Sequence, residues 1–167
     1  MVRDEDCGGN AGGYVMTRDR SLKAFNWAGL AGGCTIGAEL IHQGTLPATA
    51  RNIKLLVYYT IAVEGSAIGI LGAAISRASG NVSTKADNRN IDFDWQGCYE
   101  SAIAPFLWSA NYSDGVDQMY EVDLAGYLGK QLKLSSRVST HSTAYLCCGT
   151  GANADMNFIK AELVIVD

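Results

Sequence analysis

Apolar and polar residues alternate with a period of two along much of this chain. The longest alternating run is LPATARNIKLLVYYTIAV, residues 46–63. Successive side chains of a strand point to opposite faces, and β-branched and aromatic residues favour strands. The run therefore predicts a long core strand whose buried face carries Ile53, Leu55, Val57, Tyr59, Ile61 and Val63.

Shorter segments with the same period follow between turn-forming residues. They are YVMT and SLKAFNW around a charged turn, then IDFDW, MYEVDL, QLKLSSRV, TAYLCC and NFIKAELVIVD. Residues 66–78, SAIGILGAAISRA, have helix-like spacing but contain glycines that disfavour a helix, so we predict a strand antiparallel to its predecessor. Residues 79–90 are polar and predict a loop, while AGYLGK has room for one helical turn at most.

Strands recurring at this spacing, without a long amphipathic helix, predict an all-β fold. We expect a single antiparallel β-sandwich of the jelly-roll type over residues 14–167. Residues 1–13, MVRDEDCGGNAGG, are expected to form a short Gly-rich N-terminal arm. The 19 glycines and only 2 prolines agree with a turn-rich β-protein.

The segment AYLCCGTGANAD, residues 144–155, has the spelling of a dinucleotide-binding turn at Gly149, Gly151 and Ala154. That motif must open a helix within a βαβ unit, whereas the residues after Ala154 alternate like a strand. We therefore predict a hairpin turn between the last two strands and expect no cofactor. Neighbouring side chains in a strand diverge, so one of Cys147 and Cys148 should face the core and the other the opposite face.

No catalytic signature supports an enzyme. The chain has no GxSxG elbow, and His42 and His141 have no recognisable acid partner. His141, in the Ser/Thr-rich segment STHST, is expected to be exposed. Five cysteines without CxxC spacing favour buried or free thiols over a disulfide framework and provide no metal site.

Charge and hydropathy narrow the range of partners. The formal net charge is −4 and the cations are scattered, which disfavours nucleic-acid binding. The most apolar zone, residues 53–75, is interrupted by Lys54, Glu64 and glycines, so we expect no membrane span. The N-terminal residues lack the apolar core of a signal peptide.

Two groups of residues are candidate ligand sites. Oxygen-rich loops bind calcium in some β-sandwich modules, and Asp87, Asp92 and Asp94 form such a group. Aromatic residues interleaved with Asn and Asp occupy residues 93–112 and belong either to the core or to a carbohydrate-binding face. The candidate glycan-binding residues are Trp95, Trp108, Tyr112 and Asp114.

The segment LPATARNIKLLVYYTIAV resembles the first long core strand of jelly-roll modules in phage fibre and head-decoration proteins, with IDFDW and ELVIVD as equivalent strands. Similar LP-x-x-A openings occur in adhesive or lectin-like extracellular domains. The segment YVMTRDRSLKAFNW is similar to half of a propeller-type repeat of some phage fibres, although the usual Gly after the charged turn is absent.

The resemblance implies a structural virion protein: a phage head-decoration, fibre or tail-associated subunit. Such a subunit would self-associate, with a trimer favoured, and would bind other virion proteins through apolar faces, strand edges and the N-terminal arm. The alternative is a secreted, lectin-like module that binds a cell-surface glycan outside the cell, with or without calcium.

Overall fold

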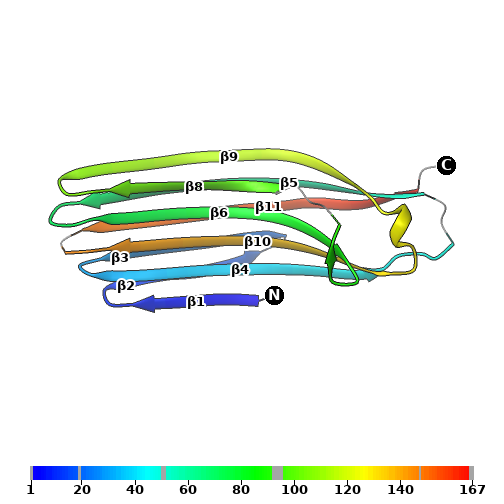
Figure 1. The fold of residues 1–167 in the computed structure, drawn as a ribbon, viewed down its shortest axis with the longest axis horizontal. Helices are drawn as coiled ribbons and strands as arrows, with labels where there is room; N and C mark the ends of the chain where they lie inside the picture. The colour runs from blue at the N-terminus through cyan, green and yellow to red at the C-terminus, as the bar shows by residue number, and fades with distance from the viewer. Residues whose placement is uncertain (1, 19, 50–51, 92–95, 147, 166–167) are drawn as a thin grey trace.

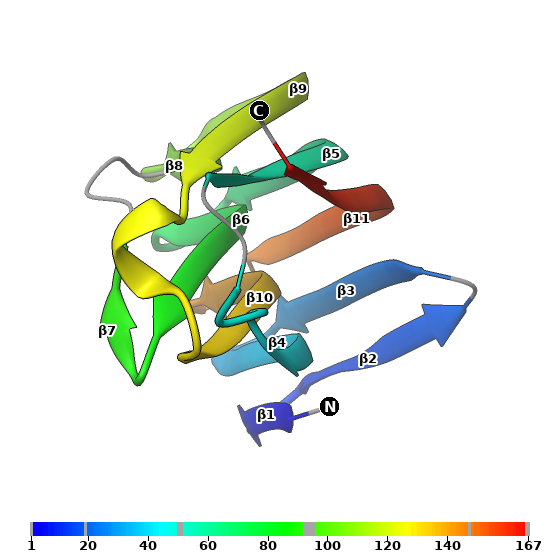
Figure 2. The same cartoon turned by 90° about the vertical axis from the view of Figure 1, so that its right-hand side faces the viewer.

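The computed structural model describes residues 2–18, 20–49, 52–91, 96–146 and 148–165. They form two antiparallel sheets packed face to face (Figures 1 and 2), so the predicted all-β sandwich is confirmed. Within these ranges no helix has the length and hydrophobicity needed to cross a bilayer. The elements are β1 (Val2–Gly8), β2 (Ala11–Arg18), β3 (Ser21–Gly29), β4 (Gly32–Thr45), β5 (Ile53–Gly69), β6 (Ala74–Ala86), β7 (Arg89–Asn90), β8 (Gln96–Ala104), β9 (Trp108–Asp123), the 3-10 turn η1 (Ala125–Tyr127), β10 (Gln131–Ala144) and β11 (Gly149–Ile165).

The connectivity is that of a jelly roll. The six-stranded sheet has the order β1-β4-β10-β6-β7, with β8 also paired to β6, and the five-stranded sheet has the order β2-β3-β11-β5-β9. From β3 onward, without the short β7, the first strand pairs with the last and the second with the next to last, as in a jelly roll. β1 and β2 extend the two sheets beside β4 and β3.

The segment expected to form an N-terminal arm is part of these sheets. β1 pairs with β4 from Val2 to Gly8, and β2 begins at Ala11. The backbone hydrogen bonds of this N-terminal segment are therefore made to strands of its own chain. Cys7 lies opposite Cys34 in this register and the two form a disulfide, so the expectation of free thiols is wrong for this pair.

The core follows the predicted period along β5 and β9. All six inward residues predicted for the long strand are buried, and so are Tyr120, Val122 and Leu124. The two short strands around residues 18–20 are confirmed as β2 and β3, and η1 is the single helical turn within AGYLGK.

Residues 66–78 do not form one strand, which corrects the sequence prediction. They comprise the end of β5, a connection and the start of β6, and β5 and β6 belong to different sheets. The chain turns where glycine is required by close approach. A Cβ on Gly69 would lie 2.3 Å from the carbonyl oxygen of Pro105, and one on Gly72 would lie 2.6 Å from that of Tyr145.

The predicted polar loop over residues 79–90 is also wrong. β6 extends to Ala86, and its inward positions Gly80, Val82 and Thr84 are buried. Two of these are glycine and threonine, so the inward face has little apolar character in the sequence. The turn itself is at Asp87 and Asn88, which adopt positive φ angles of 46° and 65°.

The segment AYLCCGTGANAD is not a hairpin turn. It connects β10 in the six-stranded sheet to β11 in the five-stranded sheet, and Gly149 and Gly151 lie within β11. Cys148 is buried, whereas Cys147 lies outside the described residues. A glycine-containing segment between two apolar runs suits either kind of connection, so the sequence did not distinguish a crossing between sheets from a hairpin within one sheet.

A buried amide joins the two sheets. Asn26 on β3 is fully buried; its Nδ2 donates to the carbonyl oxygen of Cys34 at 2.7 Å, and its Oδ1 accepts from Ser142 Oγ at 2.7 Å. β3 lies in one sheet, whereas Cys34 and Ser142 lie in the other. A buried polar group is stable only when hydrogen-bonded, so this pair of bonds favours one relative position of the sheets.

We expect Asn26→Ala to lower the free energy of unfolding by about 1–3 kcal/mol, because it leaves two buried polar groups without partners. Urea denaturation followed by circular dichroism measures this change. Asn157→Ala, at an exposed position of β11, is the matched control and should change the value by less than about 0.5 kcal/mol. Equal effects of the two substitutions would contradict the role assigned to Asn26.

Candidate binding groove

A groove of about 330 Å³ lies on the five-stranded sheet where β3, β11, β5 and β9 run side by side. Most of its lining residues occupy outward positions, which alternate with the buried positions of the same strands, while Gly65, Tyr112 and Ala152 occupy inward positions. The lining residues are Phe25, Glu64, Gly65, Ser66, Tyr112, Ser113, Gly151, Ala152 and Asn153.

Aromatic side chains border the groove on the β2–β3 side. Phe25 packs against Tyr14 with ring centroids 5.3 Å apart, and Trp27 follows two residues along β3. A Cβ on Gly12 would lie 3.5 Å from Trp27 Nε1, so the indole covers this glycine. Tyr14 and Trp27 are 46% and 43% exposed, large values for aromatic side chains that already have packed neighbours.

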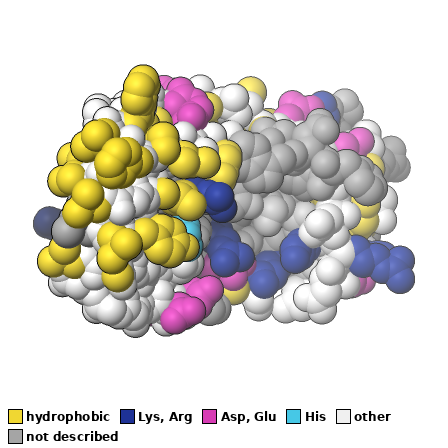
Figure 3. Space-filling view, turned by 60° about the vertical axis from the view of Figure 1, so that its left-hand side comes forward, with side chains coloured by type: hydrophobic (Ala, Val, Ile, Leu, Met, Phe, Trp, Pro, Cys, Tyr) yellow, Lys and Arg dark blue, Asp and Glu magenta, His cyan; other side chains and the backbone are white. Residues whose placement is uncertain are grey.

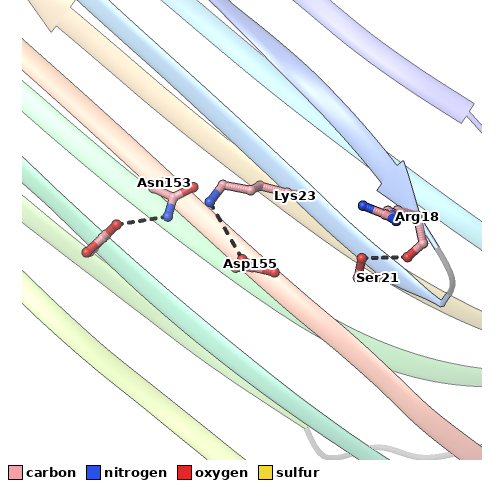
Figure 4. A network of polar contacts seen from close by, with 6 residues as sticks. Arg18, Ser21, Lys23, Asn153 and Asp155 are labelled. Atoms are coloured by element: carbon pink, nitrogen blue, oxygen red, sulfur yellow. Dashed lines mark hydrogen bonds and ion pairs between the residues drawn. The ribbon is translucent and has the colours of Figure 1, made fainter.

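Polar groups on β11 and β5 form the other side. Asn153 Nδ2 donates to Glu64 Oε1 at 2.9 Å. Farther along β11, Lys23 and Asp155 form an ion pair at 3.7 Å on the same face (Figure 4). Asn153 on β11 thus lies between Glu64 on β5 and Phe25 on β3, its partners on the two neighbouring strands.

The floor is open because it contains glycines. The nearest atom to a Cβ on Gly151 would be the carbonyl oxygen of Asn26 at 3.7 Å, which is ordinary contact. At Gly65, a Cβ would lie within 2.5 Å of the Tyr112 ring, so only glycine leaves room for this tyrosine. Ser76 Oγ donates to the Gly151 carbonyl oxygen and bonds Tyr112 OH at 3.1 Å, and burial raises the pKa of Tyr112 to about 12.

This arrangement suits binding of a neutral polyhydroxylated molecule. Aromatic rings offer apolar faces, and a fixed carboxylate and amide offer hydrogen bonds. Most glycoside hydrolases use two carboxylates across the scissile bond. Among the described residues that line the groove, Glu64 is the single carboxylate.

The structure brings one of the four predicted glycan-binding residues to the groove. Tyr112 forms part of its floor. Asp114, also on β9, accepts hydrogen bonds from Gly115 N and Cys98 Sγ. Trp108 lies at one end of the sandwich, at the start of β9, and Trp95 lies outside the described residues.

The calcium prediction stays untested. Asp87 forms an ion pair with Lys130 at 3.7 Å and accepts a hydrogen bond from Gln131 N, while Asp92 and Asp94 lie outside the described residues. In the part of the chain that is described, no group of three or more His, Cys, Asp or Glu side chains is placed to hold a metal.

Sequence reasoning missed the aromatic wall and the Asn153–Glu64 pair. The signal was present in β3, where Phe25 and Trp27 alternate with Ala24, Asn26 and Ala28. The large residues of an amphipathic strand ordinarily face the core, but here the small ones do. Alternation of large aromatic with small residues is therefore the sequence feature that marks this face.

His141 is less exposed than the sequence suggests, whereas Cys98 is a buried free thiol, as expected. His141, expected to be exposed, is half-buried, with Nδ1 2.8 Å from Thr35 Oγ1 and Nε2 3.0 Å from Thr143 Oγ1. Burial, and then the charge of Arg77, lower the pKa of His141 below 6.5. Burial also raises the pKa of Cys98 to about 11, aided by its hydrogen bond with Asp114, so this thiol is protonated at neutral pH.

No protein-family model and no curated protein matches the sequence. The glycoside hydrolase domain of Endo-D from Streptococcus pneumoniae R6 aligns with 93% of this chain and 21% of its own length, at 16% identity and a TM-score of 0.27. A carbohydrate-binding module of the β-sandwich superfamily aligns at 13% identity and a TM-score of 0.30, covering 95% of this chain and 57% of its own.

The enzymatically active domain of tailspike protein 4 from bacteriophage CBA120 aligns at 7% identity and a TM-score of 0.27, covering 95% of this chain and 19% of its own. The chain thus spans only part of each of these three proteins. Scores this low do not establish a shared fold, so no property of these proteins transfers to this chain.

The histidine environment predicts a pH dependence of stability. Because the pKa of His141 is lower in the folded chain than the usual 6.5, the unfolded chain binds more protons between the two values. The free energy of unfolding should therefore fall as the pH drops from about 7.5 to about 5.5, and His141→Gln should reduce this fall. Urea denaturation of the unmodified protein and of His141→Gln at the two pH values measures this fall. If the free energy of unfolding falls equally in both proteins, the role assigned to His141 is wrong.

Proposed function

We propose that this protein binds carbohydrate in the groove on the outer face of the five-stranded sheet. The observation that carries the proposal is the position of Phe25 next to Asn153, which forms a preformed hydrogen bond with Glu64. Exposed Trp27 lies two residues farther along β3. A sugar ring has an apolar face that stacks on an aromatic ring and equatorial hydroxyls that bond to carboxylate and amide groups. Both requirements are met across adjacent strands.

The strand framework supports specific recognition. β3, β11 and β5 are paired continuously from Gly149 to Asn157, so the polar and aromatic groups have fixed spacing. The groove volume of about 330 Å³ lies within the range of small-ligand sites, roughly 300–1,000 Å³. Tyr14 extends the aromatic border one strand outward, which suits a ligand longer than the groove itself.

The test begins with a glycan array, probed in calcium and again in chelator, followed by titration calorimetry with the best ligand. We expect binding in both conditions, because the described lining contains one carboxylate and calcium prefers six to eight oxygen ligands. Gly151→Leu projects a side chain into the groove, and Trp27→Ala removes an aromatic face. Each should weaken binding by roughly tenfold or more.

Gly44→Leu is the control for Gly151→Leu, because a Cβ on Gly44 meets no atom within 4 Å and β4 lies in the other sheet. It should leave the affinity unchanged. An array silent in both calcium and chelator, or equal affinities of the two leucine variants, would count against the proposal.

The virion role stays a prediction, as do a virion or extracellular location and the trimeric state. Its mechanism requires self-association, so size exclusion with light scattering should give a trimer or larger species. A monomer at micromolar concentration would argue against that role and would leave the glycan proposal intact.

A further inference from the structure

Among the residues that the structure describes, the connections at one end of the sandwich carry no charged side chain. The connections β1–β2, β3–β4, β5–β6, β8–β9 and β10–β11 all lie there, at the left of Figure 1, and each crosses between the sheets. No Asp, Glu, Lys or Arg occurs in the sequence segments that approach this end, residues 7–17, 24–38, 65–76, 101–113 and 142–154. Along the strands that reach this end, the uncharged stretch covers two residues of β1 and three to seven residues of each of the others.

The turns at this end carry large apolar side chains that face solvent. Figure 3 shows them gathered over the end of the molecule. The exposed fraction of these side chains ranges from 47% for Ile70 to 70% for Leu107. We call this set the apolar end; it comprises Leu30, Ile70, Leu71, Phe106, Leu107, Trp108, Tyr145 and Leu146.

Backbone hydrogen bonds between the turns and a layer of small side chains beneath them hold the apolar end in its outward position. Leu30 N donates to the carbonyl oxygen of Cys148, and Tyr145 N donates to that of Ala73, so neighbouring turns are bonded to one another. Beneath them the sheets are in contact through small side chains, which leave no space for the large ones to turn inside. This layer consists of Ala28, Ala67, Ala74, Ala102, Ala104, Ala144 and Cys148.

We propose that the apolar end inserts into the interface of a lipid bilayer. Aliphatic residues and Phe106 occupy the turns, whereas Trp108 begins β9 and Tyr145 directly follows the last residue of β10. The same order is found across a membrane interface, where Leu, Ile and Phe reach the acyl region and Trp and Tyr lie among the headgroups. Exposed apolar patches of soluble proteins mark protein or membrane contacts.

The charge distribution favours lipid over a second copy of the chain. Protein interfaces ordinarily have a polar rim that includes charged residues, and the segments at this end have none. The side chains stand on or next to four separate connections, β3–β4, β5–β6, β8–β9 and β10–β11. Arg77, three residues beyond the start of β6, is the nearest cation along that strand, and the chain carries a net charge of −4. Attraction to anionic headgroups is therefore weak, and zwitterionic lipid is the expected target.

The test is co-sedimentation with phosphatidylcholine vesicles. The intact protein should bind, and about 1 M NaCl, where the Debye length is about 3 Å, should not release it. Leu107→Asp with Leu146→Asp should lower the bound fraction by roughly tenfold or more. Brominated phosphatidylcholine should quench tryptophan fluorescence, and Trp108→Phe should reduce this quenching.

Leu163→Asp with Ile165→Asp is the matched control, because these residues are 50% and 63% exposed near the end of β11, at the opposite end of the sandwich. This variant should bind vesicles like the unmodified protein. Failure of the intact protein to bind, or equal loss in both double variants, would overturn the proposal. A further outcome would also overturn it: vesicles bind neither the unmodified protein nor the Leu107→Asp, Leu146→Asp variant, and this variant no longer self-associates in the absence of lipid. The partner of the apolar end would then be a second copy of the chain. Glycan binding is measured without vesicles, so the two proposals fail independently.

Discussion

The contact between the inner faces of the two sheets is the constraint on which the rest of this molecule depends. The size of the side chains that pack between the sheets changes along the long axis of the sandwich. The larger cluster contains Leu, Ile, Val, Tyr and Met side chains, while the cluster below the connecting turns is almost entirely alanine. Asn26, bonded to Cys34 and Ser142, joins the sheets through groups whose loss would leave buried polar atoms unpaired. Close packing of this kind fixes which side of each strand faces out.

Both surfaces proposed to bind ligands follow from small residues at inward positions. On β3, Ala24, Asn26 and Ala28 face the core, so Phe25 and Trp27 are directed outward. At the connecting turns, the alanine layer excludes the large side chains in the same way. The aromatic border of the groove and the apolar end are thus two consequences of one packing arrangement.

The sequence predicted the strands well where inward residues were large. The long strand β5 and the inward residues of β9 were correctly identified from period alone. The strand prediction failed for the second half of β6, where the inward residues Gly80 and Thr84 are not apolar. Thr84 Oγ1 forms a hydrogen bond with Tyr120 OH at 2.6 Å. The candidate site was predicted only in part: Tyr112 was identified, but Glu64 and Asn153 lie 89 residues apart and meet only because β5 pairs with β11. No local pattern encodes that pairing.

The sequence by itself determined the all-β class, the principal core strand, the absence of charge from the segments that meet at one end and the unusual size alternation in β3. These are local properties, set by the two-residue repeat of an extended chain. Only the tertiary structure decided that β10 and β11 lie in different sheets, that Cys7 bonds Cys34, and that groups from β3, β5, β9 and β11 form one groove. These depend on which strands pair, and strand pairing is decided by the packing of the whole core.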